Sequence, residues 1–303
     1  MKIHHLNCIS SCPLGGHLMD GISPSSFQRG HLCNHCLLLE TNNSLVLVDT
    51  GFGTRDVQDP GSRLSSFFLQ MLAPEFKGEL TAIRQIESLG FDPRDVQDII
   101  LTHLDFDHAG GLDDFPQARV HMLDAEKRSA EMQETWLDRQ RYRPQQWNYK
   151  QNWKTHPSTH GESWFGFKKV TPLPELQDQI ALVPLAGHTL GHAGVAINTG
   201  GQWLLNAGDA YFYKDEMNYE NPNCTPGLEF YQTLMEKDRG QRKDNQRRLR
   251  EIKKHHGTEV EIFCSHDNRE LEELKTLERT PYPLNTGQGK TAQELNSESN
   301  HHR

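Results

Sequence analysis

The chain has 303 residues, a formal net charge of −9 and a hydrophobic fraction of 35%, which suffices for an α/β domain with a buried core. A negative charge lacks the attraction for phosphate backbones that drives nucleic-acid binding, so nucleic acid is disfavoured as a partner. No run of about 18 apolar residues appears, so we expect no membrane span.

The N-terminal segment does not have the pattern of a signal peptide, because no apolar stretch follows a basic one. In a long chain without such a leader, the six cysteines are expected to be free thiols. Cys33 and Cys36 have C-x-x-C spacing, which permits a redox or zinc site, but the apolar run that follows favours a strand. We therefore expect a cytoplasmic protein.

Strands and helices are expected to alternate along the chain, which indicates an α/β layered architecture. Apolar runs predict strands at 36–40, 44–48, 99–102, 118–123, 180–184, 193–198 and 203–206, and a last strand in the segment EVEIFCSHD. Helical spacing predicts helices at 80–89, after Asp124 as a cap, and over 228–255 with apolar Leu234, Leu249 and Ile252.

Two segments depart from this alternation. Residues 132–169 form an aromatic-rich insertion with several basic residues, among them Arg139, Arg141, Arg143, Lys150 and Lys154. The insertion either lines a substrate pocket, where its positive charge would suit an anionic substrate, or packs its aromatic side chains on the scaffold or in a dimer contact. Residues 280–303 are polar, and we expect them to be a disordered tail.

Residues of metal-ligating types follow four of the predicted strands. The motif THLDFDHAGGL places His103, Asp105, Asp107 and His108 directly after a strand, and alternation along an extended segment would let the first three side chains face one cavity. The other three clusters contain His188, Asp209 and His266. Imidazole and carboxylate groups together suit zinc, iron or manganese.

These motifs, together with the early segment VLVDTG, resemble the metallo-β-lactamase superfamily over roughly residues 33–268. The segments HLDFDHAGGL and GHTLGHAG are most similar to the quorum-quenching lactonase branch. The resemblance implies a four-layer αβ/βα sandwich for a hydrolase domain spanning residues 1–279.

The resemblance also implies a site for two divalent metal ions, with zinc first and iron or manganese as alternatives. His103, Asp105 and His188 would hold one ion, Asp107, His108 and His266 the other, and Asp209 would bridge them. A bridging hydroxide would be the nucleophile, oriented by Asp107, since metal binding lowers the pKa of water toward about 7.

Two positions depart from the family pattern. Asp105 stands where most hydrolases of the family have His, so three carboxylates and a hydroxide would cancel the charge of two divalent ions, weaken their Lewis acidity and favour iron or manganese. Phe212 stands where the lactonases have Tyr. A neighbouring phenol, Tyr211 or Tyr213, would have to assist, although core packing is the simpler role for both.

The remaining histidines are expected to have lesser roles. His192 is expected to support the ligands rather than bind metal itself. His4, His5, His17, His31, His35 and His121 are expected to be surface or ordinary packing residues.

We therefore predict a dinuclear metallohydrolase that acts on a small ester-like substrate, with lactones first. Thioester or phosphodiester hydrolysis, and oxidoreduction at a di-iron centre because of Asp105, are the alternatives. A small molecule is the expected partner, and a homodimer is left open.

Overall fold

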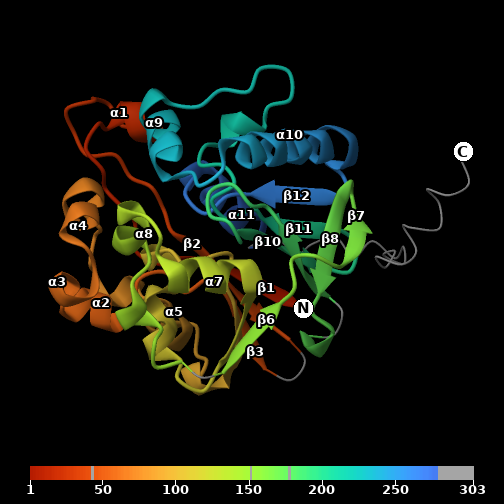
Figure 1. The fold of residues 1–303 in the computed structure, drawn as a ribbon, viewed down its shortest axis with the longest axis horizontal. Helices are drawn as coiled ribbons and strands as arrows, with labels where there is room; N and C mark the ends of the chain where they lie inside the picture. The colour runs from red at the N-terminus through yellow and green to blue at the C-terminus, as the bar shows by residue number, and fades with distance from the viewer. Residues whose placement is uncertain (42–43, 151, 177–178, 279–303) are drawn as a thin grey trace, which may run out of the picture.

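The structure is a computed structural model that describes residues 1–41, 44–150, 152–176 and 179–278. Two six-stranded sheets pack face to face, and helices cover their outer faces (Figure 1). The four-layer αβ/βα sandwich expected from the sequence is thereby confirmed. The expected tail lies outside the described residues, as do two residues of the expected turn at 41–43.

The first sheet has the order β1-β2-β3-β4-β5-β6. Its strands are β1 (Lys2–Asn7), β2 (His35–Glu40), β3 (Leu45–Val48), β4 (Val96–Ile100), β5 (Arg119–Leu123) and β6 (Trp153–His156). Strands β1 to β3 pair antiparallel, and β3 to β6 pair parallel. All four residues of β3 are buried, as expected for a strand covered on both faces.

The second sheet has the order β12-β11-β10-β9-β8-β7. Its strands are β7 (Glu162–Trp164), β8 (Phe167–Pro172), β9 (Ile180–Pro184), β10 (Ala193–Asn198), β11 (Trp203–Asn206) and β12 (Val260–Phe263). Strands β11 and β12 are parallel, and the other neighbours are antiparallel. An apolar core between the sheets joins side chains such as Val48 and Ile100 to Val195 and Leu204.

The helices lie on the outside of this sandwich (Figure 1). The α-helices are α1 (His17–Asp20), α2 (Thr54–Gln58), α3 (Pro60–Arg63), α4 (Ser66–Leu72), α5 (Ala82–Ser88), α6 (Phe106–Ala109), α7 (Asp124–Met132), α8 (Trp136–Arg141), α9 (Pro226–Met235), α10 (Arg239–His256) and α11 (Asn268–Glu278). Within the described residues, six short 3-10 helices lie in the segments between the larger elements: η1 (Gly78–Leu80), η2 (Pro93–Asp95), η3 (Gly110–Asp114), η4 (Pro144–Gln146), η5 (Pro174–Leu176) and η6 (Lys214–Met217). Ile86 of α5 packs on the first sheet, and Leu249 and Ile252 of α10 pack on the second.

Two local predictions were wrong. The single helix expected over 228–255 is two helices, because the side chain of Asp238 caps a new helix at the backbone nitrogen of Gln241. Of the apolar residues noted in that stretch, Leu249 and Ile252 are buried and Leu234 is exposed. Asp124 lies inside the first turn of α7, and Leu123 is its N-cap residue.

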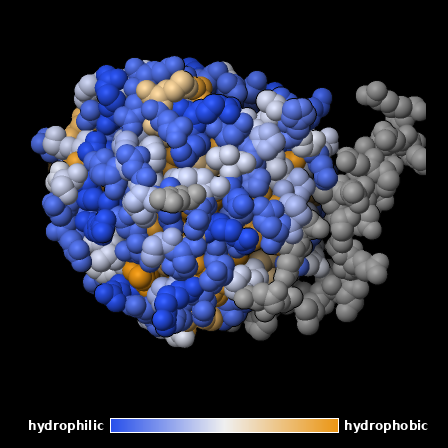
Figure 2. Space-filling view, turned by 60° about the horizontal axis from the view of Figure 1, so that its bottom comes forward, coloured by the Kyte–Doolittle hydropathy of each residue, from blue (hydrophilic) through white to orange (hydrophobic). Residues whose placement is uncertain are grey.

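The surface is mainly polar on the face that Figure 2 shows, where hydrophobic residues form small, separate patches. Among the described residues, no helix is both long enough and apolar enough to cross a bilayer. All six cysteines are free thiols, as predicted.

Candidate metal centre

The seven candidate ligands lie in loops or short turns that follow β4, β9, β11 and β12. His103 and Asp105 follow β4 in extended backbone, and the chain then turns into α6, which carries Asp107 and His108. The predicted alternation of side chains therefore stops at Asp105. All seven side chains are nevertheless buried and converge on one site.

Three of the four histidines have their Nδ1 atom engaged by a neighbour. His103 Nδ1 lies 2.9 Å from Thr102 Oγ1, His108 Nδ1 lies 2.9 Å from Asp49 Oδ2, and His266 Nδ1 lies 2.7 Å from the carbonyl oxygen of Cys33. Such contacts fix the ring orientation and direct Nε2 to the centre of the site. Asp49, in the segment VLVDTG, thus orients His108.

One set of donors surrounds the first half of the site. His103 Nε2 lies 3.4 Å from Asp105 Oδ2, and His188 Nε2 lies 3.1 Å from the same oxygen. Asp209 Oδ2 lies 3.4 Å from His188 Nε2. Tetrahedral ligands about 2.0–2.1 Å from one zinc ion are themselves about 3.3 Å apart, so these spacings fit a divalent ion.

A second set surrounds the other half, where Asp209 offers its other oxygen. Asp209 Oδ1 lies 3.3 Å from His108 Nε2 and 3.2 Å from His266 Nε2. Asp107 Oδ2 is 3.8 Å from His266 Nε2. Within the described residues, His103 Nε2, His108 Nε2 and Asp209 Oδ1 are buried without a hydrogen bond. Buried polar atoms are rarely left unpaired, so this donor set fits metal ions.

Arg141 is the main feature of the site that sequence reasoning missed. It is fully buried at the end of α8 and donates two hydrogen bonds to Asp105, from Nε to Oδ1 at 2.7 Å and from Nη2 to Oδ2 at 2.5 Å. Nη2 also lies 2.7 Å from His188 Nε2. Although burial acts in the opposite direction, Arg141 and then His103 hold the pKa of Asp105 well below its usual range.

The insertion at 132–169 therefore has a mixed role. Trp147 and Trp164 are buried in the apolar cores of the two halves, which agrees with the scaffold-packing alternative. Two of its five basic residues point into the protein: Arg141 pairs with Asp105, and the buried Lys150 donates to the carbonyl oxygens of Phe115 and Ala118.

His192 supports the site from behind, in agreement with its expected role. Its Nε2 accepts a hydrogen bond of 2.9 Å from the backbone nitrogen of Asp209, and its Nδ1 lies 3.1 Å from the carbonyl oxygen of Leu185. Burial, followed by the neighbouring His188, lowers the pKa of His192 to about 3, so its ring is neutral. Of the remaining histidines, four are buried, namely His4, His5, His35 and His121.

The two tyrosines that flank Phe212 make their contacts away from the candidate metal centre. Phe212 itself stacks on His266, with ring centroids 5.1 Å apart. Tyr211 donates to the buried Glu270, 2.9 Å away, and Tyr213 stacks with Arg269. Neither hydroxyl is directed at the site by a contact that the structure records.

Tyr231, on α9, is a phenol that the sequence did not single out. Its ring packs against Phe212 at 5.5 Å. Burial, and then the charges of Asp107, Asp105 and Asp209, raise the pKa of Tyr231 well above its usual value. Its hydroxyl has no hydrogen-bond partner within the described part of the chain.

Known proteins resemble this chain over much of its length. The sequence profile described as the metallo-beta-lactamase superfamily matches residues 34–249. A protein of Mycobacterium bovis named as a probable metallo-hydrolase is 39% identical over 88% of this chain and 80% of its own length. An N-acyl homoserine lactonase of a Bacillus species is 29% identical over 61% of this chain and 66% of its own length.

Solved structures share the fold. An N-acyl homoserine lactone hydrolase with N-hexanoyl-L-homoserine at its catalytic metal centre has a TM-score of 0.65 at 23% identity, covering 90% of this chain and 95% of that one. A dizinc quorum-quenching lactonase has a TM-score of 0.56 at 17% identity, covering 87% and 86%.

Proposed function

Because the chain belongs to the metallo-β-lactamase superfamily and is a metal-binding hydrolase of lactonase-like ancestry, we propose that it hydrolyses a small ester-like substrate, with lactones as the first class. The observation that carries the proposal is the convergence of seven buried donors, with one oxygen of Asp209 directed to each half of the site. The relatives favour neither the thioester, the phosphodiester nor the di-iron alternative.

The proposed ligands are arranged for two divalent ions. His103, Asp105 and His188 would hold one, and Asp107, His108 and His266 would hold the other, while Asp209 would serve both. Bound ions would supply a Lewis acid for the carbonyl and lower the pKa of a water molecule toward about 7. Zinc suits the four imidazoles best, and manganese or iron suits the three carboxylates.

The three carboxylates differ in what they can still do for a substrate. Each oxygen of Asp105 already accepts one bond from Arg141, which leaves its remaining lone pairs for an ion, and both oxygens of Asp209 face imidazoles. The carboxylate of Asp107 is the most exposed of the three, at 9% against 3% for Asp105 and 5% for Asp209. Asp107 is therefore the group that orients the attacking water and accepts its proton.

The direct test is a panel of substrates assayed with protein whose metal content has been measured. We expect N-acyl homoserine lactones or simpler lactones to be opened to hydroxy acids one water heavier, detected by mass spectrometry. Chelation should abolish turnover, and added zinc or manganese should restore it. Faster turnover of thioesters or phosphodiesters than of every lactone would contradict the proposed substrate class.

Tyr231→Phe should lower kcat/KM for the substrate about a hundredfold. Its phenol is free to donate to the carbonyl or leaving oxygen, and one donor to a developing oxyanion contributes about 10²–10³ in rate. Metal content should not change, because Tyr231 is not one of the seven proposed metal ligands. Tyr213→Phe is the matched control and should retain wild-type turnover; equal rates in both variants would exclude the role of Tyr231.

A further inference from the structure

A second group of metal-ligating side chains lies away from the candidate centre. His121 of β5, His156 of β6 and Glu175 of η5 place one ligand atom each within 4.8 Å of the others. His121 Nδ1 is 3.2 Å from His156 Nε2 and 3.4 Å from Glu175 Oε1. These spacings match the value of about 3.3 Å between tetrahedral zinc ligands.

The proton on His121 is fixed by a carboxylate behind it. His121 Nε2 lies 2.8 Å from Asp98 Oδ1, and Arg119 holds Asp98 with two bonds of 2.7 and 2.8 Å. Since Nε2 donates to Asp98, the lone pair of Nδ1 is directed to His156 and Glu175. A carboxylate that orients a ligating imidazole in this way is the usual support of a protein zinc site.

The second imidazole is also suited to ligation. The ring of His156 stacks on that of His121, with ring centroids 5.5 Å apart and an interplanar angle of 13°, and this packing holds its Nε2 beside His121 Nδ1. Asp98 and Glu175 line one surface cavity of about 460 Å³. The carboxylate of Glu175 can therefore be reached from solvent.

The three residues of this group come from both halves of the sandwich. Strand β6 is the edge strand of the first sheet, whereas η5 connects strands β8 and β9 of the second. We propose that His121, His156 and Glu175 bind a zinc ion, with water as the remaining ligand, and that this ion fastens the edge strand β6 to the second half of the sandwich. The site is separate from the candidate metal centre.

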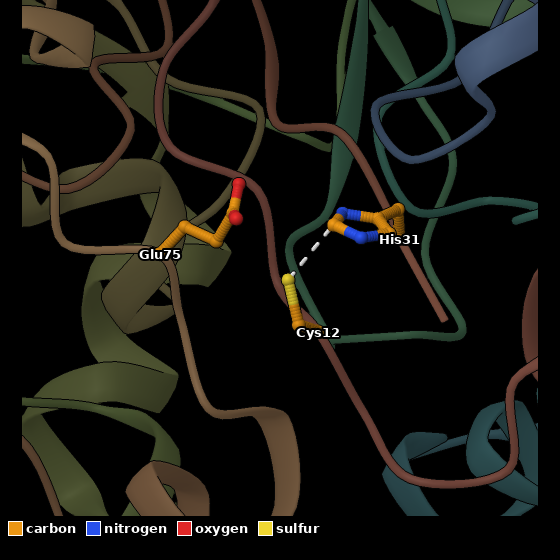
Figure 3. A group of neighbouring side chains, drawn as sticks. All are labelled: Cys12, His31 and Glu75. Atoms are coloured by element: carbon orange, nitrogen blue, oxygen red, sulfur yellow. Dashed lines mark hydrogen bonds between the residues drawn. The ribbon is translucent and has the colours of Figure 1, made fainter. Parts of the chain in front are cut away.

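A third group, Cys12, His31 and Glu75, has less support (Figure 3). Cys12 Sγ lies 3.5 Å from His31 Nδ1, but His31 is exposed and no carboxylate orients its ring by a recorded contact. Burial and then Glu75 raise the pKa of the Cys12 thiol to about 11, so forming the thiolate that zinc requires is costly. This group serves as a comparison in the experiment.

The experiment is a zinc count on the full chain, equilibrated with zinc against a weak chelator and measured by mass spectrometry. We expect His156→Ala and Glu175→Gln each to bind one zinc equivalent fewer than the wild type. Asp98→Asn keeps all three ligands but should weaken that equivalent about 10–100-fold. His160→Ala, which removes an exposed histidine four residues from His156, is the matched control and should retain the wild-type count.

The measured quantity is the difference in zinc equivalents between each variant and the wild type. It therefore reports on the His121, His156 and Glu175 site whatever number of ions the candidate metal centre holds. Should His156→Ala be poorly folded, Glu175→Gln decides the question. An unchanged count in Glu175→Gln would overturn the proposal. The proposal would also be overturned if Cys12→Ser bound one zinc equivalent fewer while His156→Ala and Glu175→Gln both kept the wild-type count.

Discussion

Arg141→Met should lower the free energy of unfolding of the metal-free protein by about 3–5 kcal/mol, because it strands a buried carboxylate without its partner. Asp105 is 2% exposed, and its two oxygens receive both bonds of the Arg141 fork. Arg141 also donates 2.7 Å to the carbonyl oxygen of Met235, which would lose that bond. Urea denaturation of chelator-treated protein measures the change.

A double variant separates the ion pair from simple packing. Arg141→Met with Asp105→Asn removes both charges, so it should be less destabilised than Arg141→Met alone. Arg139→Met, an exposed arginine on the same helix, is the matched control and should change stability by less than about 0.5 kcal/mol. If the double variant is as unstable as the single one, the charge of Asp105 is not the cause.

The same ion pair alters the electrostatics of the proposed site. Counted from ligands alone, Asp105, Asp107, Asp209 and a hydroxide cancel two divalent ions, which would weaken their Lewis acidity. Arg141 adds one positive charge within bonding distance of Asp105. The site then has the net charge of a family member with His at this position. Asp105→His alone would leave Arg141 unpaired, so only the double change with Arg141→Met restores the common arrangement.

Strands β2 to β5 and β9 to β12 could be predicted because each is a short apolar run, whereas β1, β6, β7 and β8 contain many polar residues and were not predicted. The predicted 180–184, 193–198 and 203–206 coincide with β9, β10 and β11. The helix predicted over 228–255 failed because tertiary contacts interrupt it: the backbone nitrogens of Lys237 and Asp238 donate to the carbonyl oxygen of Gly187, in the loop that carries His188. The helical spacing of apolar residues in the sequence gives no information about such a long-range hydrogen bond.

The ligand candidates could be found from sequence because each follows a strand in a compact motif. Arg141 could not, because it meets Asp105 across 36 residues and belongs to a segment whose other arginines face solvent or backbone. Tyr231 lies on a helix with no motif, and only the packing of α9 over Phe212 brings it to the site. His121 looked like a packing residue because Asp98, His156 and Glu175 are brought to it only by the fold.

Asp209→Ala is expected to reduce bound metal from the proposed two ions per chain to fewer than one and to lower turnover at least about a thousandfold. Asp209 is the candidate ligand with one oxygen near each donor set, 3.3 Å from His108 Nε2 and 3.4 Å from His188 Nε2. Two divalent ions about 3.5–4 Å apart repel by on the order of 20 kcal/mol at an effective dielectric constant near 20. A shared carboxylate attracts both ions and offsets much of that repulsion.

The fold should survive this substitution, because the contact that holds the loop is made by the backbone nitrogen of Asp209 with His192 Nε2 and does not need the side chain. Metal analysis and thermal unfolding of the same preparation therefore separate loss of ions from loss of structure. Asp215→Ala deletes a more exposed carboxylate six residues further on and should keep both metal content and turnover. Two ions bound at wild-type affinity in Asp209→Ala would show that the six other ligands suffice, and that the two donor sets do not depend on a shared oxygen donor.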